Sequence, residues 1–250
     1  MSIHRKSNYE VNIMKQAGNI VALVHAAMKD AVKEGVTTKE LDELAFKIIK
    51  QNKAEPTFLG YNGFPASICA SINEMVVHGI PSHDQILKNG DIISIDIGAT
   101  FKGFVGDSAW TYPVGEISDE KKMLLKATEE SLFAGLEHMK SNDRLENVAG
   151  AIEDVAKKYN LGIVRQYGGH GVGRQMHEEP FVFNYRTNNP LILQRNMTIA
   201  IEPMLNLGCD DVEVLEDNWG VVTKDKKPSA HFEHTVCVTD SGPEILTKLL

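Results

Sequence analysis

Four carboxylates and one histidine, spread over more than half of the 250-residue chain, are the residue types of a metal site: Asp96, Asp107, His170, Glu202 and Glu233. Four clustered carboxylates without a cation would repel one another and stay partly protonated, whereas their charges would balance two divalent cations. Two such ions about 3.5–4 Å apart hold a bridging water and lower its pKa from about 15.7 towards 7, so that hydroxide forms near neutral pH. The set predicts a two-metal hydrolase site.

Two of these carboxylates lie on neighbouring β-rich runs, residues 92–99 and 103–110. A tight turn near Phe101 and Lys102, with Gly103 at its end, would make the runs a hairpin and place Asp96 opposite Asp107, or one bulge away, on the same face. Taken alone, two aspartates beside a turn are more often solvated charges. The flanking isoleucines favour burial, where an unpaired carboxylate is costly, so we expect one ion to bridge the pair.

Composition excludes several classes of protein. The chain is 42% hydrophobic and carries 34 Asp and Glu against 26 Lys and Arg, which disfavours direct nucleic-acid readout by its whole surface. Its three cysteines are far apart and indicate neither a disulfide framework nor a zinc finger. The first ten residues lack the apolar core of a signal peptide, and no stretch approaches a membrane span. We therefore expect a cytoplasmic protein with no membrane partner.

The chain also repeats its own plan. Helical periodicity predicts four helices, at residues 9–33, 39–50, 118–140 and 143–159, which open at the capping signals Ser7, Thr37, Ser118 and Asp143. β-rich runs follow each helix pair, and a last run, residues 230–238, would mirror the strand of Asp107.

The offset between the two copies is constant at key positions. Asp96 precedes Glu202 by 106 residues, and the run LKNGDIISID at 87–96 matches LQRNMTIAIE at 193–202 in length and ending. Identity is slight, so a chance match is the alternative. The repeat predicts one α+β catalytic domain over residues 1–250, with pseudo-two-fold halves at roughly 7–115 and 118–247 whose antiparallel sheets surround a central cleft.

The candidate residues sit within an ordered series of motifs: Asn73-Glu74, Val77-His78-Gly79-Ile80-Pro81, Ile95-Asp96, Gly106-Asp107, Gly169-His170-Gly171-Val172-Gly173, His177-Glu178-Glu179-Pro180, Ile201-Glu202-Pro203 and Phe232-Glu233-His234-Thr235. Over essentially the whole chain this series resembles the methionine aminopeptidases, in their type I, bacterial form. The resemblance implies the pita-bread fold, a dinuclear metal centre, and removal of the initiator methionine from nascent polypeptides by a metal-bridging hydroxide.

The residues and the resemblance agree on a ligand arrangement. One ion would be held by four groups, Asp107, His170, Glu202 and Glu233, and the other by Asp96 with shared oxygens of Asp107 and Glu233. Mostly oxygen ligands with one imidazole suit Mn, Fe(II) or Co better than a structural zinc, without selecting among them. Glu202 is expected to carry the proton of the attacking water to the leaving amine.

The resemblance assigns the substrate contacts as well. His177 would polarise the scissile carbonyl, and His78 would orient the amide near the first residue, although a lone histidine is more often a satisfied surface or core residue. The methionine pocket would be apolar and shallow, with walls from Phe58, Tyr61, Phe64, Cys69, Met176 and Trp219. Without the resemblance, such residues would be assigned to the core. Burying a methionine side chain is worth roughly 1.5–3 kcal/mol.

Four positions depart from the family pattern: Phe58, Phe64, Met176 and His231. The first three leave the pocket's substrate tolerance open. His231 stands where glutamine is common, two residues before Glu233. It is expected either to donate a hydrogen bond to a ligating carboxylate or metal-bound water, or to pack passively.

The predicted function is that of a monomeric metalloaminopeptidase acting on N-terminal Met peptides and nascent polypeptides, with a small second residue favoured. A proline-directed peptidase of the same fold is one alternative, but those relatives carry an additional N-terminal domain. An inactive pita-bread binding module is the other, and the five intact ligands disfavour it. A transient ribosome contact through lysine-rich helix faces stays open.

Overall fold

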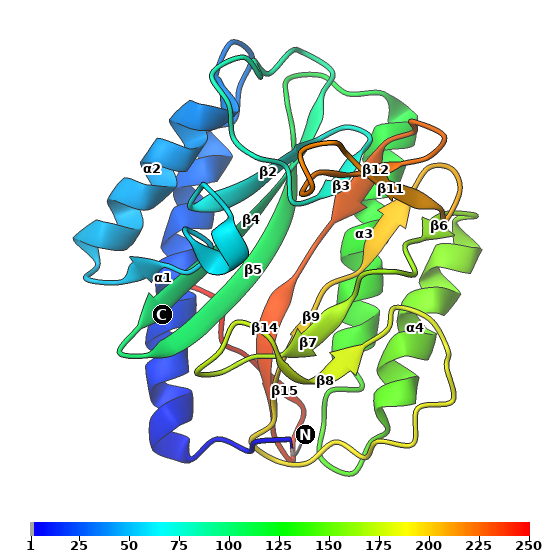
Figure 1. The fold of residues 1–250 in the computed structure, drawn as a ribbon. Coiled ribbons are helices and arrows are strands. Elements are labelled where there is room, and N and C mark those ends of the chain that lie inside the picture. The colour runs from blue at the N-terminus through cyan, green and yellow to red at the C-terminus, as the bar shows by residue number, and fades with distance from the viewer. Residues whose placement is uncertain (1–2) are drawn as a thin grey trace.

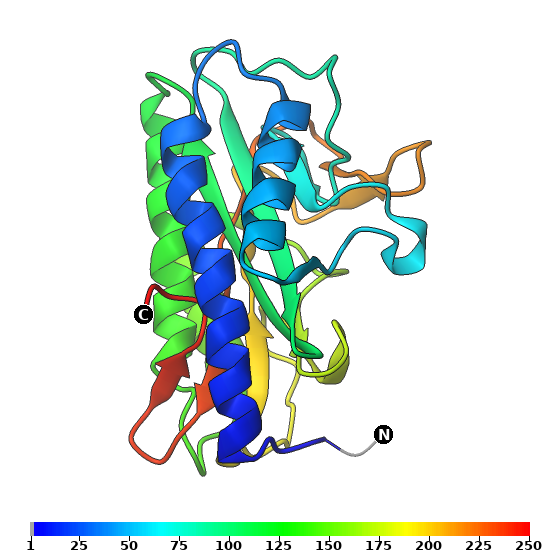
Figure 2. The ribbon, with the colours of Figure 1, turned by 90° about the vertical axis from the view of Figure 1, so that its left-hand side faces the viewer.

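The computed structural model describes residues 3–250 and has two similar halves lying side by side. Helices α1 (Asn8–Ala31) and α2 (Thr38–Gln51) belong to the first half, and α3 (Asp119–Leu136) and α4 (Leu145–Lys158) to the second (Figure 1). The side view in Figure 2 shows α1 and the green helices of the second half towards the left of the molecule, while loops project to the right. The open face of the strands is therefore available for a site.

The predicted capping signals start three of the four helices. Ser7 and Thr37 each accept a hydrogen bond from the backbone of the glutamate three residues later, and that glutamate bonds back to the cap, so both capping boxes are complete. Ser118 caps α3. The helices end within two residues of the predicted positions. The exception is α3, which stops at Leu136 instead of about residue 140, and Lys140 beyond it pairs with Thr239.

The start of α4 differs from the prediction. Arg144, not Asp143, is its N-cap residue, and no side chain caps it. The carboxylate of Asp143 instead accepts hydrogen bonds from the Arg144 amide and the Asn147 side chain. The Glu146 carboxylate accepts hydrogen bonds from the backbone amides of residues 187–189 and so anchors a distant loop to this helix.

Within residues 3–250 the strands form four sheets. In the first half, β4 (Ile92–Phe101) is flanked by β1 (Glu55–Pro56), β2 (Ile68–Ile72) and β5 (Phe104–Pro113), all antiparallel to it. The second half contains a five-stranded sheet in the order β15 (Pro243–Ile245), β14 (His234–Val238), β9 (Thr198–Ile201), β7 (Gly169–Gly171), β8 (Glu178–Val182). A three-stranded sheet has the order β13 (Ser229–His231), β10 (Met204–Asn206), β6 (Gly162–Ile163). A second three-stranded sheet has the order β11 (Val212–Val214), β12 (Val221–Thr223), β3 (Met75–Val77), so it contains strands of both halves.

The β4–β5 hairpin is present, but its register differs from the prediction. Lys102 and Gly103 form the turn, both with positive φ, so the turn is centred one residue later than expected. Asp96 consequently lies opposite Ala109, and Asp107 lies opposite Gly98. The two aspartates still share a face, because their positions differ by two residues across the ladder, but they are diagonal neighbours without an intervening bulge.

The predicted strand over residues 230–238 is wrong as one continuous element. It is split into β13 and β14, which belong to different sheets, with Phe232 and Glu233 between them. The Glu233 amide is not free to continue either sheet, because it donates to the Ala109 carbonyl of β5 at 2.8 Å.

The two halves meet along what we call the seam, where residues 107–111 of β5 run beside residues 231–235. The Thr235 hydroxyl donates to the Asp107 carbonyl at 2.8 Å and accepts from the Asp107 amide at 3.2 Å. The Thr111 hydroxyl does the same for the carbonyl and amide of His231, at 2.8 and 2.9 Å. Threonine hydroxyls thus satisfy backbone groups at both ends of the seam, where strand pairing would otherwise be expected.

Separate apolar clusters fill the two halves. Helix α1 packs on β4 and β5 in the first, and α3 packs on α4 and reaches β9, β10 and β13 in the second. A third cluster, containing Met14, Phe104 and Val172, extends towards the open face and includes several residues predicted as pocket walls. Across residues 3–250, every helix is too short or too polar to cross a membrane.

Candidate metal centre

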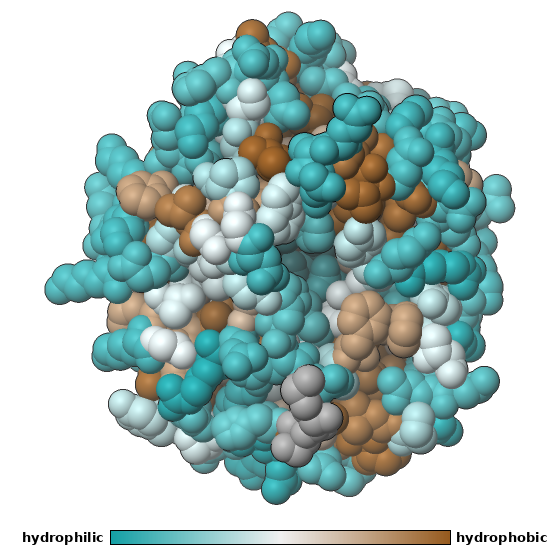
Figure 3. Space-filling model, viewed as in Figure 1, coloured by the Kyte–Doolittle hydropathy of each residue, from teal (hydrophilic) through white to brown (hydrophobic). Residues whose placement is uncertain are grey.

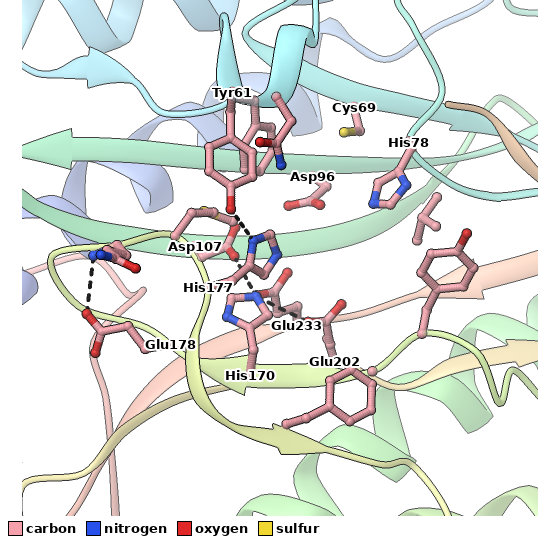
Figure 4. A pocket seen from close by; sticks show the side chains of 18 of the residues that line it. Tyr61, Cys69, His78, Asp96, Asp107, His170, His177, Glu178, Glu202 and Glu233 are labelled. Atoms are coloured by element: carbon pink, nitrogen blue, oxygen red, sulfur yellow. Dashed lines mark hydrogen bonds and ion pairs between the residues drawn. The ribbon is translucent and has the colours of Figure 1, made fainter. Parts of the chain in front are cut away.

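All five predicted ligands line one cavity of about 890 Å³ on the open face. It opens near the middle of the surface in Figure 3, and the close view in Figure 4 shows the side chains converging from both halves. Asp96 projects from β4 and Asp107 from β5, while His170 lies on β7, Glu202 directly follows β9, and Glu233 separates β13 from β14.

His170 is oriented as a metal-binding imidazole. Its Nδ1 lies 2.9 Å from the Gly171 carbonyl, which can only accept, so Nδ1 carries the proton and the Nε2 lone pair faces the cavity. Nε2 is 3.5 Å from an oxygen of Asp107 and 3.5 Å from one of Glu202. Although burial opposes protonation, these carboxylates raise the pKa of His170 to about 9. The position therefore attracts either a proton or a cation.

Two of the carboxylates also have raised pKa values, which means that the site disfavours their negative charge when no cation is bound. Burial and neighbouring acidic groups, Asp107 first among them, raise the pKa values of Asp96 and Glu233 well above their ordinary range. Within residues 3–250, one buried oxygen on each of Asp96, Asp107 and Glu233 has no hydrogen-bond partner. The donor atoms of Asp107, His170 and Glu233 lie within 4.8 Å of one another. Orphaned oxygens that repel one another around an imidazole fit divalent cations.

The two other predicted histidines border this centre. His177 stacks edge-on against His170 with ring centroids 4.3 Å apart, and its Nδ1 is 2.8 Å from the Tyr61 hydroxyl. Desolvation and the nearby His170 lower the pKa of His177. Burial, together with His231 and His177, lowers the pKa of His78 to about 4. Both imidazoles are therefore neutral at pH 7.

His78 has an unusual backbone conformation, with φ of 61°. A bulky residue in the left-handed region is strained, and such positions cluster at functional sites. Its ring lies edge-on to Tyr167 at 5.6 Å and to Trp219 at 6.5 Å.

The predicted pocket walls line the same cavity: Phe58, Tyr61, Phe64, Cys69, Met176 and Trp219. Phe64 and Trp219 pack edge-to-face at 5.1 Å. Phe58 lies over Gly98, where a Cβ would come within 2.6 Å of the ring, so the glycine is needed for this close approach.

Cys69 lies directly across the β2–β4 ladder from Asp96. Burial and that carboxylate raise the pKa of its thiol well above the ordinary value. A buried thiol held protonated is a wall residue and a poor nucleophile.

Sequence reasoning missed several residues of the site. Tyr167 and Met204 line the cavity, and the hydroxyls of Thr111 and Thr235 hold the segment that carries Glu233. Tyr167 could have been found from the sequence, because it lies three residues before His170 and is followed by the glycine pair Gly168-Gly169. Thr235 belongs to the motif Phe232-Glu233-His234-Thr235, but the sequence does not show that its hydroxyl bonds to the backbone of Asp107 in another sheet.

Comparison with known proteins places this site in a family. The model of metallopeptidase family M24 matches residues 12–240. The chain is 51% identical to "Methionine aminopeptidase 1" of Bacillus subtilis, over 98% of both chains. The chain belongs to the methionine aminopeptidases of metallopeptidase family M24. The resemblance to the bacterial type I form is thereby confirmed.

Solved structures agree with the family's fold. A methionine aminopeptidase from Thermotoga maritima superimposes with a TM-score of 0.97 at 40% identity, covering 99% of this chain and 100% of that one. A prolidase from Pyrococcus furiosus has a TM-score of 0.77 at 23% identity, covering 98% of this chain and 65% of its own, which shows a shared fold only. The predicted pita-bread fold of this methionine aminopeptidase family member is confirmed.

Proposed function

We propose that the protein removes the initiator methionine from nascent polypeptides, using the cavity shared by its two halves. The observation that carries this proposal is the convergence of Asp96, Asp107, His170, Glu202 and Glu233 on one cavity whose other end is apolar. Family membership supports a metallopeptidase that uses divalent metal. Residues 1–250 would act as a single catalytic domain, with halves near 7–115 and 118–247.

The five clustered side chains would hold two ions, of Mn, Fe(II) or Co. Asp107 and Glu233 would be shared between the ions, with Asp96 completing one set and His170 and Glu202 the other. Divalent ions at such a site act as Lewis acids, which polarise a carbonyl and make water nucleophilic near pH 7. The unpartnered carboxylate oxygens support this assignment.

The protein's own groups would position the substrate and move the proton. With Nδ1 of His177 accepting from the Tyr61 hydroxyl, its Nε2–H is left to donate to the scissile carbonyl oxygen. His78 would orient the amide near the first residue, and its neutral ring suits hydrogen bonding without adding charge. Glu202 would take the proton of the attacking water and deliver it to the leaving amine.

The substrate's methionine side chain would enter between Phe64, Trp219 and Phe58, with Cys69 and Met176 completing the wall. Sulfur–aromatic contacts there would add about 0.3–1.5 kcal/mol to the free energy gained by burying its apolar surface. The second residue would lie beside His78 and His177, where Ala, Gly or Ser fits and Arg, Phe or Leu clashes. We therefore expect preference for a small second residue.

Peptide hydrolysis tests this proposal. Met-Gly-x and Met-Ala-x peptides should be cleaved after methionine, while Met-Phe-x should fall by at least about tenfold in kcat/KM, the effect of roughly 1.4 kcal/mol in transition-state binding. Comparable kcat/KM for Met-Gly and Met-Phe peptides contradicts the pocket assignment. Cleavage of x-Pro peptides in place of Met peptides would favour the proline-directed alternative instead.

The proposed setting is the cytoplasm, with the protein working as a monomer on chains as they leave the ribosome. Sedimentation of the purified protein checks the oligomeric state. The inactive-module alternative has little support, because none of the five expected ligands is replaced.

A further inference from the structure

The imidazole of His231 lies near one oxygen of the Glu202 carboxylate, and the imidazole of His170 lies near the other. His231 is 1% exposed, and its Nε2 lies 3.4 Å from Glu202 Oε2 and 3.9 Å from Glu233 Oε2. In the part of the chain that the structure describes, this buried nitrogen has no hydrogen-bond partner. A buried polar atom left unpaired beside two carboxylates requires an explanation.

The distances from His231 Nε2 to the two carboxylates are closer to the distance between two donor atoms on one metal ion than to the length of a hydrogen bond. A charge-assisted N–H···O bond is about 2.7–2.9 Å long, shorter than the 3.4 Å seen here. Two donors each about 2.0–2.2 Å from an ion, at the angles of tetrahedral or octahedral coordination, lie roughly 3.0–3.5 Å apart. His170 stands at 3.5 Å from the other oxygen of Glu202. The Glu202 carboxylate therefore sits between two similarly placed imidazoles.

Two groups of three side chains bring their donor atoms close enough together to bind one metal ion. Glu202, His231 and Glu233 each offer one atom, and these atoms lie within 4.8 Å of one another, as do those of Asp107, His170 and Glu233. We propose that His231 is a further metal ligand, whose Nε2 binds a divalent ion together with Glu202 and Glu233. This inference rests on the proposed function and adds a second imidazole to its metal centre.

The backbone holds His231 in place for this role. Its amide and carbonyl are both bonded to the Thr111 hydroxyl in the seam, and β13 pairs it with Met204 of β10. A ligand fixed from both sides is ordered before the ion arrives, which favours binding.

A second imidazole changes which metals the centre prefers. Oxygen-only sites suit Mn(II) and Mg(II), whereas imidazole ligands favour ions later in the Irving–Williams order. We therefore expect His231 to strengthen binding of Co(II) more than binding of Mn(II). A glutamine at this position would supply no imidazole nitrogen.

Titration of the two metals into His231 variants tests the proposal. Chelator-stripped wild type, His231→Gln and His231→Leu are each titrated with CoCl₂ and, separately, with MnCl₂ by calorimetry. Both variants should lose at least about tenfold in Co(II) affinity at one site, with a smaller loss for Mn(II). His83→Gln, a change at an exposed histidine outside the cavity, should match the wild type in both titrations.

The pattern across the variants separates the three roles for His231. If Gln retains wild-type Co(II) affinity and Leu does not, His231 is a hydrogen-bond donor and the proposal is overturned. If both variants bind Co(II) as the wild type does, the ring packs passively and the proposal is equally overturned.

Direct observation of the ligands provides a readout that does not depend on affinity. Pulsed EPR on protein loaded with less than one Mn(II) or Cu(II) per chain, and anomalous scattering from Co(II)-soaked crystals, should both show coordination by His231 in the wild type. They should show loss of that nitrogen in His231→Gln. Anomalous peaks that all lie more than about 3 Å from Nε2 would exclude the ligand role, since metal–imidazole bonds are about 2.0–2.1 Å long.

The proposed function is tested separately by hydrolysis of Met-Ala-x with the wild-type protein and Mn(II). Failure to cleave this peptide would refute the function while leaving the coordination by His231 standing.

Discussion

Replacing Thr235 by valine tests whether the seam holds the two halves together. Valine has nearly the same shape as threonine but cannot donate or accept a hydrogen bond. Thr235 is fully buried, and its hydroxyl serves both the carbonyl and the amide of Asp107. The substitution therefore leaves two backbone groups of a proposed ligand buried without partners.

The expected cost follows from those two groups. A buried donor or acceptor that loses its partner costs about 1–3 kcal/mol. With two such groups and some relaxation, Thr235→Val should lower the free energy of unfolding by about 2–4 kcal/mol. Thr128→Val is the matched control, because Thr128 is equally buried but its hydroxyl bonds only to the Leu124 carbonyl within its own helix.

Urea unfolding of the chelator-treated proteins, followed by both circular dichroism and tryptophan fluorescence, measures the difference without any contribution from metal. A loss no larger than that of Thr128→Val, or below about 0.5 kcal/mol, would refute the argument that the Thr235 hydroxyl stands in for strand pairing. Metal affinity should also fall in Thr235→Val and stay unchanged in the control.

Three further outcomes are expected. Asp107→Ala should abolish Met-Ala-x hydrolysis, because its two oxygens are proposed to bridge both ions; activity within tenfold of wild type under saturating Mn(II) or Co(II) would sink the bridging role. Chelation should stop hydrolysis and lower the unfolding midpoint, and Mn(II) at 100 times its Kd should restore about 2.7 kcal/mol of stability; an unchanged midpoint would argue against metal bound only by the folded state. Burial lowers the pKa of His25 from 6.5 to about 3, so between these pH values the unfolded chain binds the extra proton and stability falls as the pH falls. From pH 7 to 5, wild type should lose about 2 kcal/mol more than His25→Gln in urea titrations, and equal slopes for the two proteins would show that His25 does not contribute.

The sequence was most informative where local chemistry decides structure. The capping boxes at Ser7 and Thr37 form as expected, since each needs only residues three apart. The β4–β5 hairpin was also predicted correctly. Its register was not, because the turn is centred one residue later than the position assumed, and a shift of one turn residue moves every cross-strand pair.

Tertiary contacts explain the other errors. The break of the last carboxylate strand at Phe232 and Glu233 arises because the Glu233 amide bonds to Ala109 in the other half, and no property of the local sequence reports this contact. The placement of His231 against Glu202 had a hint in the alternation of side chains along that segment. The distance between His231 Nε2 and Glu202 distinguishes a metal ligand from a hydrogen-bond donor, and this distance can be obtained only from the three-dimensional structure.

The position of the proposed metal centre at the seam has a consequence for how the chain assembles. The first half carries Asp96 and Asp107, and the second carries His170, Glu202 and Glu233, so neither half contains all of the proposed ligands. Ion binding and closure of the seam are then thermodynamically linked: each favours the other by the same free energy. Two fragments made by cutting the chain between β5 and α3 are expected to associate more tightly when a divalent ion is supplied, because the ion would bind side chains of both fragments.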